Sequence, residues 1–600
     1  MRSLFYLVIL ASIVLSCNQS SKTAIISESN RDLANFFENY YERRMELYPV
    51  ESTINGETNY NDLLPAEFTD SYREKIRDFF RPYLNAINKF NRDSLNEVDQ
   101  TSYDIFKREM EMTLEGLQYQ YAFTSGYDIN GHIPFQQFWA LPLTLGQMGS
   151  GSGSQPFKTI QDYDNWLKRA GGFGAWSDSA IVYFRKGIAE NYVLPRKLVI
   201  KMIPQMQDMV VPDVTKSLFY GPINNFPKDF SDQDKKRLKE EYTALIKNVL
   251  FPSYQKLANF LKNEYLPKGR VTTGMKDEPG GDAIYKYLVK YWTTTNETPD
   301  EIYNTGLAEV KRIRQLMDSI RVATGFKGDL PAFFEFMKTD KRFMPYKTPA
   351  DVLAAFNGIL SRIQPNLKNM FGRTPKMKFE IRQTEAFRAA SASAEYIQGT
   401  ADGSRPGIFY IPILDATKFN TTSGMESLFL HEAIPGHHYQ VALTIEDTTL
   451  PKFRRYLWYG AYGEGWALYC ESLGKELGLY TDPYQYMGAL GDEIHRAIRL
   501  VVDVGMHSKN MTREEAIKYM MENEAISEEG ATAEIERYMA IPGQALSYKI
   551  GALKIKELRE KYSKQMGDKF SLSAFHDEFL HFGCMPLELV EQSMDKWANK

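Results

Sequence analysis

The segment from His431 to His438 concentrates the residue types of a hydrolytic metal site. Its sequence, HEAIPGHH, holds three of the chain's eight histidines, and the carboxylate of Glu432 directly follows the first. In the related pattern H-E-x-x-H, two imidazoles one helical turn apart bind zinc, and the glutamate is the general base toward a metal-activated water. We therefore interpret this segment as a zinc hydrolase motif that carries an insertion.

The insertion leaves the second histidine ligand open. Position i+4 from His431 is Pro435. On an uninterrupted helix His437 would lie roughly 240° around from His431, and His438 would return to the same face about 10.5 Å further along. Proline next to Gly436 favours a bulge or kink. A bulge that absorbs two residues would bring His437 beside His431, leaving His438 to contact substrate or support a ligand. One alternative is that His438 is the second ligand. Another is that all three histidines only cap or pack a kinked helix and bind no metal.

A catalytic zinc usually has three protein ligands, so a third donor is needed. In the segment EGWALYCE, Glu464 and Glu471 are seven residues apart and fall on nearly the same helix face. Acid pairs at this spacing usually mark an exposed face. The neighbouring Trp466 and Tyr469 instead indicate a buried helix, where a carboxylate without a cation is costly. We predict that Glu464 is the third ligand and that Glu471 supports a ligand.

The segments HEAIPGHHYQ, EGWALYCE and PGQALSYKIG resemble those of the bacterial domain-of-unknown-function 885 family. That family is similar to the gluzincin metallopeptidases. The spacing of Glu464 and Glu471 resembles the second motif of thermostable-carboxypeptidase-like and oligopeptidase-like enzymes, in which the first acid binds zinc. The resemblance covers most of the mature chain. It implies a mainly α peptidase with a deep central cleft and one Zn²⁺ per chain.

Amide hydrolysis also needs a donor that stabilises the tetrahedral oxyanion. In related peptidases a tyrosine from a late segment has this role, so the resemblance implies Tyr548 here, within PGQALSYK. Most of the 37 tyrosines in the chain must be structural, which is the competing interpretation for Tyr548. Lys549 could anchor a substrate carboxylate.

A further constellation lies between His495 and His507. Arg496, Arg499 and Asp503 are spaced i, i+3 and i+7, so they share one helix face. Two interpretations stay open: an Arg–Asp ion-pair network, or an arginine that binds the terminal carboxylate of a peptide through a bidentate fork. His507 could instead donate a hydrogen bond to the oxyanion.

Two short segments upstream of the zinc motif favour strands. Met377, Phe379 and Ile381 alternate with polar residues, and 407–414 (GIFYIPIL) is a bounded apolar run. With the intervening 390–398 (ASASAEYIQ), they predict a small antiparallel sheet next to the zinc-binding helix. An edge strand beside the cleft could bind an extended peptide through its main chain.

The N-terminal sequence has the pattern of an export signal. Arg2 precedes an apolar stretch, 4–15, that is too short for a permanent membrane span. The sequence VLSC resembles a loose lipobox, so we expect residues 1–17 to be a lipoprotein signal ending at an acylated Cys17, followed by a polar tether over 18–30. Ordinary cleavage to a soluble periplasmic protein is the alternative. The expected location is the bacterial cell envelope, facing the periplasm, with membrane contact through the lipid anchor only.

Composition excludes several classes of protein. Only Cys470 and Cys584 remain after acylation, too few for a disulfide framework. The net charge of -4 and pI near 6.2 give no case for nucleic-acid binding. With 43% apolar residues, the chain can bury an extensive core.

Helix signals dominate the rest of the chain. Capping boxes begin helices at Thr298 and Thr512. The clearest breaks are the Gly/Ser-rich 146–154 and the segment 267–281. The second break predicts an N-terminal helical half (31–275) and a C-terminal catalytic half (276–600) that form one body around the cleft. The glycine-rich loops could gate the cleft or be plain surface connections.

Together these observations predict a zinc metallopeptidase that hydrolyses short peptides. Zinc would be held by His431, His437 and Glu464, with Glu432 as general base. Two rival functions remain: a catalytically inactive peptide-binding lipoprotein with a structural or lost metal site, and a zinc amidase acting on non-peptide bonds.

Overall fold

The computed structural model describes residues 30–121, 123–124, 127–128, 130–384, 393–400, 403 and 405–599. The predicted signal, the lipobox Cys17 and the tether up to residue 29 lie outside these residues. Within the described part of the chain, no helix combines the length and the apolar character that a membrane crossing requires.

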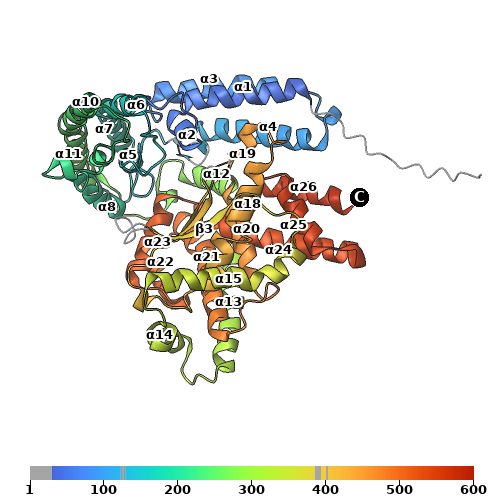
Figure 1. Ribbon diagram of the computed structural model, residues 1–600. Coiled ribbons are helices and arrows are strands. Elements are labelled where there is room, and N and C mark those ends of the chain that lie inside the picture. The colour runs from blue at the N-terminus through green and yellow to red at the C-terminus, as the bar shows by residue number, and fades with distance from the viewer. Residues whose placement is uncertain are drawn as a thin grey trace, which may run out of the picture.

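The fold is mainly α, which confirms the predicted class. The first part contains α1 (Arg31–Leu47), α2 (Pro49–Ile54), α3 (Asp70–Ile87), α4 (Glu97–Gly116), the short strands β1 (Phe123–Thr124) and β2 (Tyr127–Asp128), α5 (Leu141–Gly149), α6 (Ile160–Gly171), α7 (Phe173–Ala189), α8 (Arg196–Gln207), α9 (Gly221–Asn224), α10 (Asp232–Leu245) and α11 (Phe251–Phe260). In Figure 1, α1, α3 and α4 lie along one edge of the molecule, and α5 to α11 gather at one corner.

The second part fills the rest of the molecule (Figure 1). It contains α12 (Gly281–Thr293), α13 (Pro299–Ala323), α14 (Leu330–Thr339), α15 (Pro349–Met370), β3 (Phe379–Gln383), β4 (Glu395–Ile397), β5 (Gly407–Ile411), α17 (Met425–Glu432), α18 (His437–Glu446), α19 (Lys452–Arg455), α20 (Gly460–Ser472), α21 (Pro483–Ser508), α22 (Arg513–Asn523), α23 (Glu528–Ala540), α24 (Ser547–Met566), α25 (Leu572–His581) and α26 (Leu587–Ala598). Both predicted capping boxes are confirmed, since Thr298 caps α13 and Thr512 caps α22, each with its glutamate reaching back.

Strands β3, β4 and β5 form a small sheet in the order β3-β5-β4. β4 pairs with β5 antiparallel, as predicted, but β3 pairs with β5 parallel, so the prediction of an all-antiparallel sheet was wrong. Side-chain alternation shows which residues of a strand face inward, but it carries no information on strand direction. The apolar β5 is the central strand, and β3 and β4 are the edges.

Two hydrophobic cores hold the helices together, and each draws on residues from before and after position 275. One joins Trp166 and Phe219 with Val501 and Leu546. The other joins Phe37 and Phe106 with Phe453 and Trp466. Apolar burial therefore packs the N-terminal helices directly against the segments that carry the candidate site.

Helices α20 and α24 touch backbone to backbone, and this contact places the EGW segment against the PGQALSYK segment. A Cβ atom added at Gly551 would lie 1.9 Å from the carbonyl oxygen of Ala461, and one added at Gly465 would lie 2.6 Å from the Cα of Gly551. Only glycines allow this approach. It positions Glu464 on α20 next to Tyr548 on α24.

We predict that Gly551→Ala destabilises the protein. The added methyl group must push the two helices apart, at a cost of about 1–3 kcal/mol, which outweighs the gain in helix propensity of about 1 kcal/mol. The matched control is Gly358→Ala on α15, where a Cβ would meet no atom within 4 Å. We expect the control to be as stable as the wild type or slightly more stable. Thermal unfolding midpoints measure both, and equal midpoints for the two variants would contradict the close contact.

Candidate metal centre

The helix that begins at Met425 breaks directly after Glu432, as the Pro-Gly insertion predicts. α17 ends at Glu432 and α18 begins at His437, with a cis peptide bond before Pro435. A Cβ on Gly436 would lie 1.9 Å from the carbonyl oxygen of His431, so the chain can fold back on α17 only with glycine at this position.

This break brings His431 and His437 together. Their ring centroids are 4.9 Å apart, and the rings are nearly perpendicular at 88°. The indole of Trp466 on α20 donates a hydrogen bond of 2.9 Å to the carbonyl oxygen of Pro435, which ties the break to α20. The two imidazoles thus face the helix that carries Glu464.

Glu464 meets both imidazoles with one oxygen atom. Its Oε2 lies 3.4 Å from Nε2 of His431 and 3.4 Å from Nε2 of His437. Ligands about 2.1 Å from a tetrahedral zinc ion are about 3.4 Å from one another. Two imidazole nitrogens and a carboxylate oxygen are also a donor set that zinc commonly takes in catalytic sites. The three side chains therefore fit a divalent cation of this kind.

Glu432 belongs to the same cluster. One carboxylate oxygen of Glu432 and one nitrogen of each imidazole, from His431 and His437, lie within 4.8 Å of one another. Both glutamates, Glu432 and Glu464, are thus near the candidate cation position. One oxygen of Glu464 is equidistant from both imidazoles, which favours the predicted role of Glu464 as the third ligand. Burial raises the pKa of Glu432, and the neighbouring imidazoles oppose this rise.

Glu471 orients the first imidazole. The Nδ1 of His431 donates a 2.7 Å hydrogen bond to Glu471, which turns Nε2 toward Glu464. Burial by itself would lower the pKa of His431, but hydrogen bonds to Glu464 and Glu471 raise it to about 10. Burial would raise the pKa of Glu464, and the two imidazoles hold it well below its usual range. The predicted support of a ligand by Glu471 thus has a geometric basis.

His438 points away from the cluster and toward the sheet. Its Nδ1 lies 3.0 Å from the hydroxyl of Tyr396 on β4, and its ring centroid is 4.9 Å from that of Phe379 on β3. On β5, a Cβ at Gly407 would come within 2.9 Å of the same nitrogen. Burial lowers the pKa of His438 to about 4. The sequence left open which of the two histidines accompanies His431. In the structure His437 lies in the cluster, whereas His438 contacts residues of all three strands and so links α18 to the sheet.

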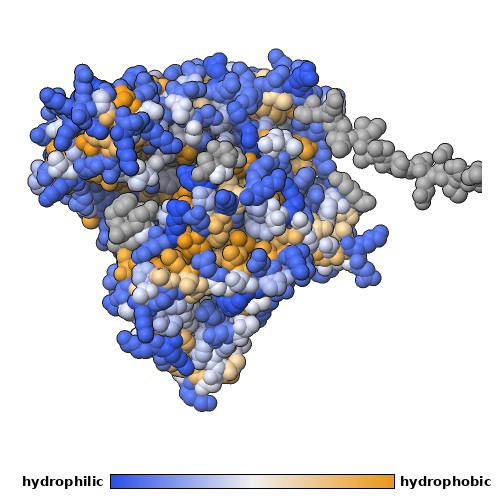
Figure 2. Space-filling model, in the orientation of Figure 1, coloured by the Kyte–Doolittle hydropathy of each residue, from blue (hydrophilic) through white to orange (hydrophobic). Residues whose placement is uncertain are grey.

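The cluster opens into a cavity of about 2260 Å³. Figure 2 shows the face of the molecule on which apolar side chains gather between hydrophilic margins, over the sheet. The cavity is lined by His431, Glu432, His437, Glu464 and Tyr548, and also by segments from the N-terminal half. These include Ser150 to Ser154, so the Gly/Ser-rich break forms part of the cavity wall rather than a plain surface connection.

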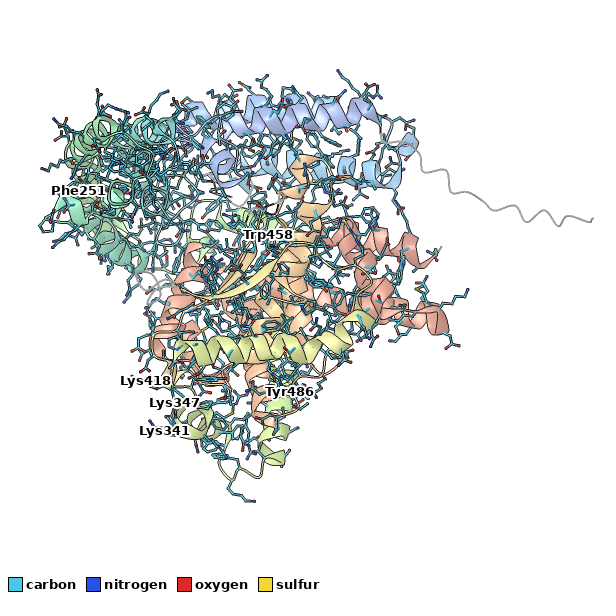
Figure 3. All side chains as sticks on the ribbon, viewed as in Figure 1. Phe251, Lys341, Lys347, Lys418, Trp458 and Tyr486 are labelled. Atoms are coloured by element: carbon cyan, nitrogen blue, oxygen red, sulfur yellow. The ribbon has the colours of Figure 1, made fainter. Side chains whose placement is uncertain are left out.

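Trp458 is a cavity residue that the sequence did not reveal. Its ring lies 5.9 Å from that of His437 and rests against Gly463, while 38% of the residue remains exposed. Figure 3 shows it near the middle of the molecule, beside the strands. The sequence could not predict that Trp458 lines the cavity, because it is one of seven tryptophans and lies outside the motifs.

Tyr548, the predicted oxyanion donor, lies in the first turn of α24. It lines the cavity, and burial together with the charge of Glu464 raises the pKa of its hydroxyl. The group therefore stays protonated near neutral pH and can donate a hydrogen bond. The guanidinium of Arg499 stands 4.5 Å from the centroid of the Tyr548 ring.

Two other predicted residues lie outside the site. Lys549 is buried, and its Nζ forms ion pairs of 2.8 Å with Glu309 and Glu493, so it cannot anchor a substrate. The ring of His507 accepts from the backbone N–H of Met275 at 3.1 Å and donates to a backbone carbonyl at 3.0 Å. Burial lowers the pKa of His507 to about 3, and the residue has a structural role rather than contact with the oxyanion.

The arginines of α21 reach the cavity, but their ion pairs differ from those predicted. Arg496 pairs with Asp492 at 3.4 Å and Arg499 with Glu534 at 3.1 Å. Asp503 instead accepts from the hydroxyl of Tyr285 at 2.6 Å and from a backbone N–H. The two arginines line the cavity, whereas Asp503 has its partners on other segments, so the predicted Arg–Asp503 network is replaced by other pairs.

Residues 49–594 match the family model "Bacterial protein of unknown function (DUF885)". The chain belongs to this family. The resemblance carried by HEAIPGHHYQ, EGWALYCE and PGQALSYKIG is thereby confirmed.

Solved structures extend the comparison. The "putative lipoprotein" of Colwellia psychrerythraea is similar with a TM-score of 0.88 and 27% identity over 95% of this chain and 99% of its own. A "putative lipoprotein of unknown function" from Shewanella oneidensis has a TM-score of 0.70 and 18% identity, over 94% and 99%. Pyrococcus furiosus carboxypeptidase has a TM-score of only 0.38 at 9% identity, too weak a likeness for any conclusion. Among curated proteins, no sequence matches this chain.

We predict that His437→Ala empties the metal site and that His438→Ala leaves it filled. His437 is the predicted second ligand, whereas loss of His438 removes the partner of Tyr396 and costs about 1–3 kcal/mol of stability instead. Zinc per chain, measured by mass spectrometry after dialysis, and thermal unfolding midpoints separate the two effects. The opposite pattern, with zinc lost only from His438→Ala, would make His438 the ligand.

Proposed function

We propose that this protein is a zinc-dependent peptidase that hydrolyses short peptides in its cavity. The observation that supports this most is the single oxygen of Glu464 at 3.4 Å from both imidazole nitrogens of His431 and His437. Beside it, Glu432 lies on the cavity wall. A ligand set next to a spare carboxylate in a large cavity is the arrangement that metal-assisted hydrolysis requires.

The proposed cofactor is one Zn²⁺ ion held by His431, His437 and Glu464. When bound, such an ion supplies a Lewis acid that activates water and polarises a carbonyl group. Glu471 keeps the His431 ring in the orientation that directs Nε2 toward the ion, and it raises the basicity of that ring.

Glu432 is the proposed general base. Its carboxylate accepts the proton of the water that attacks the peptide carbonyl carbon. As the C–N bond breaks, Glu432 returns that proton to the leaving amine. Tyr548 donates its hydroxyl hydrogen bond to the carbonyl oxygen, where negative charge develops.

Strand β4 is the proposed guide for the substrate main chain. One side of β4 pairs with β5, and residues 395–398 line the cavity. An extended peptide can add to such an edge through backbone hydrogen bonds, which gives affinity with little sequence preference. Trp458 next to His437 offers a flat apolar surface for a substrate side chain.

We also propose that the protein is anchored in the bacterial cell envelope through Cys17 and faces the periplasm. The VLSC sequence supports this, as do the lipoprotein names of the two similar structures. A role in turnover of short peptides in the periplasm suits this location, and no nucleic acid is expected as a partner.

We predict that Glu432→Gln keeps zinc near one per chain but loses peptide cleavage by about 10²–10⁴-fold, because the amide cannot accept the proton. The matched variant Glu464→Gln should lose both zinc and cleavage. Metal analysis and a peptide library, analysed by mass spectrometry, provide the two readouts.

Each rival function has its own outcome in this experiment. Zinc-loaded wild type that binds library peptides without cleaving them would indicate the inactive binding protein. Cleavage confined to non-peptide amides would indicate the amidase. Equal cleavage by the wild type and Glu432→Gln would exclude Glu432 as the base.

A further inference from the structure

Three arginines form a cluster on the cavity wall next to the proposed metal site. Arg496 and Arg499 come from α21 and Arg537 comes from α23, and all three line the cavity. Arg499 lies over the ring of Tyr548 at 4.5 Å. Arg496 reaches to 3.7 Å from Glu471, the residue that holds His431. The arginine cluster is thus adjacent both to the proposed oxyanion donor and to the support of a proposed ligand.

The carboxylates around the cluster do not satisfy it. Arg499 and Arg537 share the same oxygen of Glu534, each at 3.1 Å. Arg537 also donates to the neutral amide of Gln544 at 2.9 Å. Arg499 also donates to the hydroxyl of Tyr538 at 2.8 Å and lies 3.2 Å from Nε2 of His495. Two guanidinium groups therefore share one carboxylate.

The other charged groups that face the cluster are already paired. His495 lies 2.8 Å from Glu524 and 3.4 Å from Glu534. Asp492 accepts from Arg496 and from the hydroxyl of Ser427. With these acids nearby, recognition of a ligand here depends on the geometry of the unpaired donors rather than on an excess of positive charge.

Two donors in the cluster have no acceptor among the residues that the structure describes. These are Nη1 of Arg499 and Nε of Arg496, and both atoms are buried. The Arg499 side chain is only 8% exposed. A buried donor without an acceptor costs free energy, so native structures almost always provide one from the protein, from water or from a ligand. Other atoms of both residues line the cavity, so a small rotation of either side chain would present its unpaired donor to a ligand there.

We propose that the arginine cluster binds the C-terminal carboxylate of a peptide, so that the enzyme removes residues from the C-terminal end. A carboxylate is planar and accepts two hydrogen bonds, which matches the donors that guanidinium groups present. Arg499 lies 4.5 Å from the ring of Tyr548, so a carboxylate held at Arg499 would bring the preceding part of the peptide near the proposed oxyanion donor. This inference rests on the proposed peptidase function and deepens it, since it restricts the substrates to peptides with a free C-terminus.

The first experiment needs no variant. Wild-type protein is given two peptides of identical sequence, one ending in a free carboxylate and one in a carboxamide, each with an internal glutamate. We expect the acid to be cleaved with at least a 10-fold higher kcat/KM, and the products to be one or two residues released from the C-terminus. Preference for the internal glutamate regardless of the terminus would overturn the inference, because the cluster would then recognise a side chain.

The second experiment assigns the effect to Arg499. For Arg499→Gln we expect kcat/KM on the acid peptide to fall about 10- to 100-fold, mainly through KM, as loss of a charged hydrogen-bond partner predicts. Cleavage of the amide peptide should fall by much less, because Arg499 also packs on the ring of Tyr548. The acid-to-amide ratio should therefore approach one. General damage to the fold would reduce both reactions together. Arg499→Lys keeps the positive charge but loses the paired donors of the guanidinium group. This variant should retain only part of the preference for the acid peptide.

Arg382→Gln is the matched control. Arg382 also lines the cavity, but it lies on β3 and pairs with Glu380 at 2.5 Å. Its replacement removes one positive charge from the same cavity and should leave the acid-to-amide ratio unchanged. A ratio that falls equally in Arg382→Gln and Arg499→Gln would overturn the inference, because it would indicate a general effect of charge.

Failure of the inference and failure of the peptidase proposal can be distinguished. If the wild type cleaves acid and amide peptides equally, the peptidase proposal holds and the inference is wrong. If neither is cleaved, the binding of the two fluorescently labelled peptides to the zinc-loaded protein decides the matter. At least 10-fold tighter binding of the acid, lost in Arg499→Gln, would support the carboxylate site without peptidase activity. Equal binding of both peptides would overturn both proposals.

Discussion

The carboxylate of Glu464, held between the imidazoles of His431 and His437, is the interaction on which the rest of the site depends. Three carboxylates, from Glu432, Glu464 and Glu471, gather around these two imidazoles. Such a concentration of charge in a buried place is costly unless cations balance it. A divalent ion would balance it, and this is the physical reason for the proposal of a metal centre rather than a structural ion-pair network.

Three sets of contacts keep these side chains in place. The break at Gly436 turns α18 back on α17, and the Trp466 indole holds this break against α20. The contact through Gly465 and Gly551 fixes α20 against α24, and thereby Glu464 against Tyr548. The His438 ring attaches α18 to the sheet whose edge strand lines the cavity. The two contacts made by glycine, at Gly436 and between Gly465 and Gly551, leave no room for any side chain unless the backbone moves.

A series of contacts between charged side chains connects the candidate metal centre to α21. Glu471 connects His431 to Arg496, and Arg499 follows one turn later over Tyr548. The cavity wall therefore carries the proposed ligands, the hydroxyl of Tyr548 and the guanidinium groups of Arg496 and Arg499. A peptide that lies along this wall would meet groups suited in turn to its scissile carbonyl and to its terminal carboxylate.

The sequence alone determined the residue types and much of the local structure. Three histidines and a glutamate around Pro-Gly, the E-x6-E spacing and the capping boxes predicted the metal chemistry, the break in the helix and the mainly α fold, because these patterns act within a few residues. Only the tertiary structure decided the rest. It selected His437 over His438, made β3 and β5 parallel, removed Lys549 and His507 from the site, and added Trp458 and Glu534. Each of these outcomes depends on packing between segments far apart in the chain, where the side chain that becomes a neighbour is set by burial and close contact rather than by spacing along the sequence.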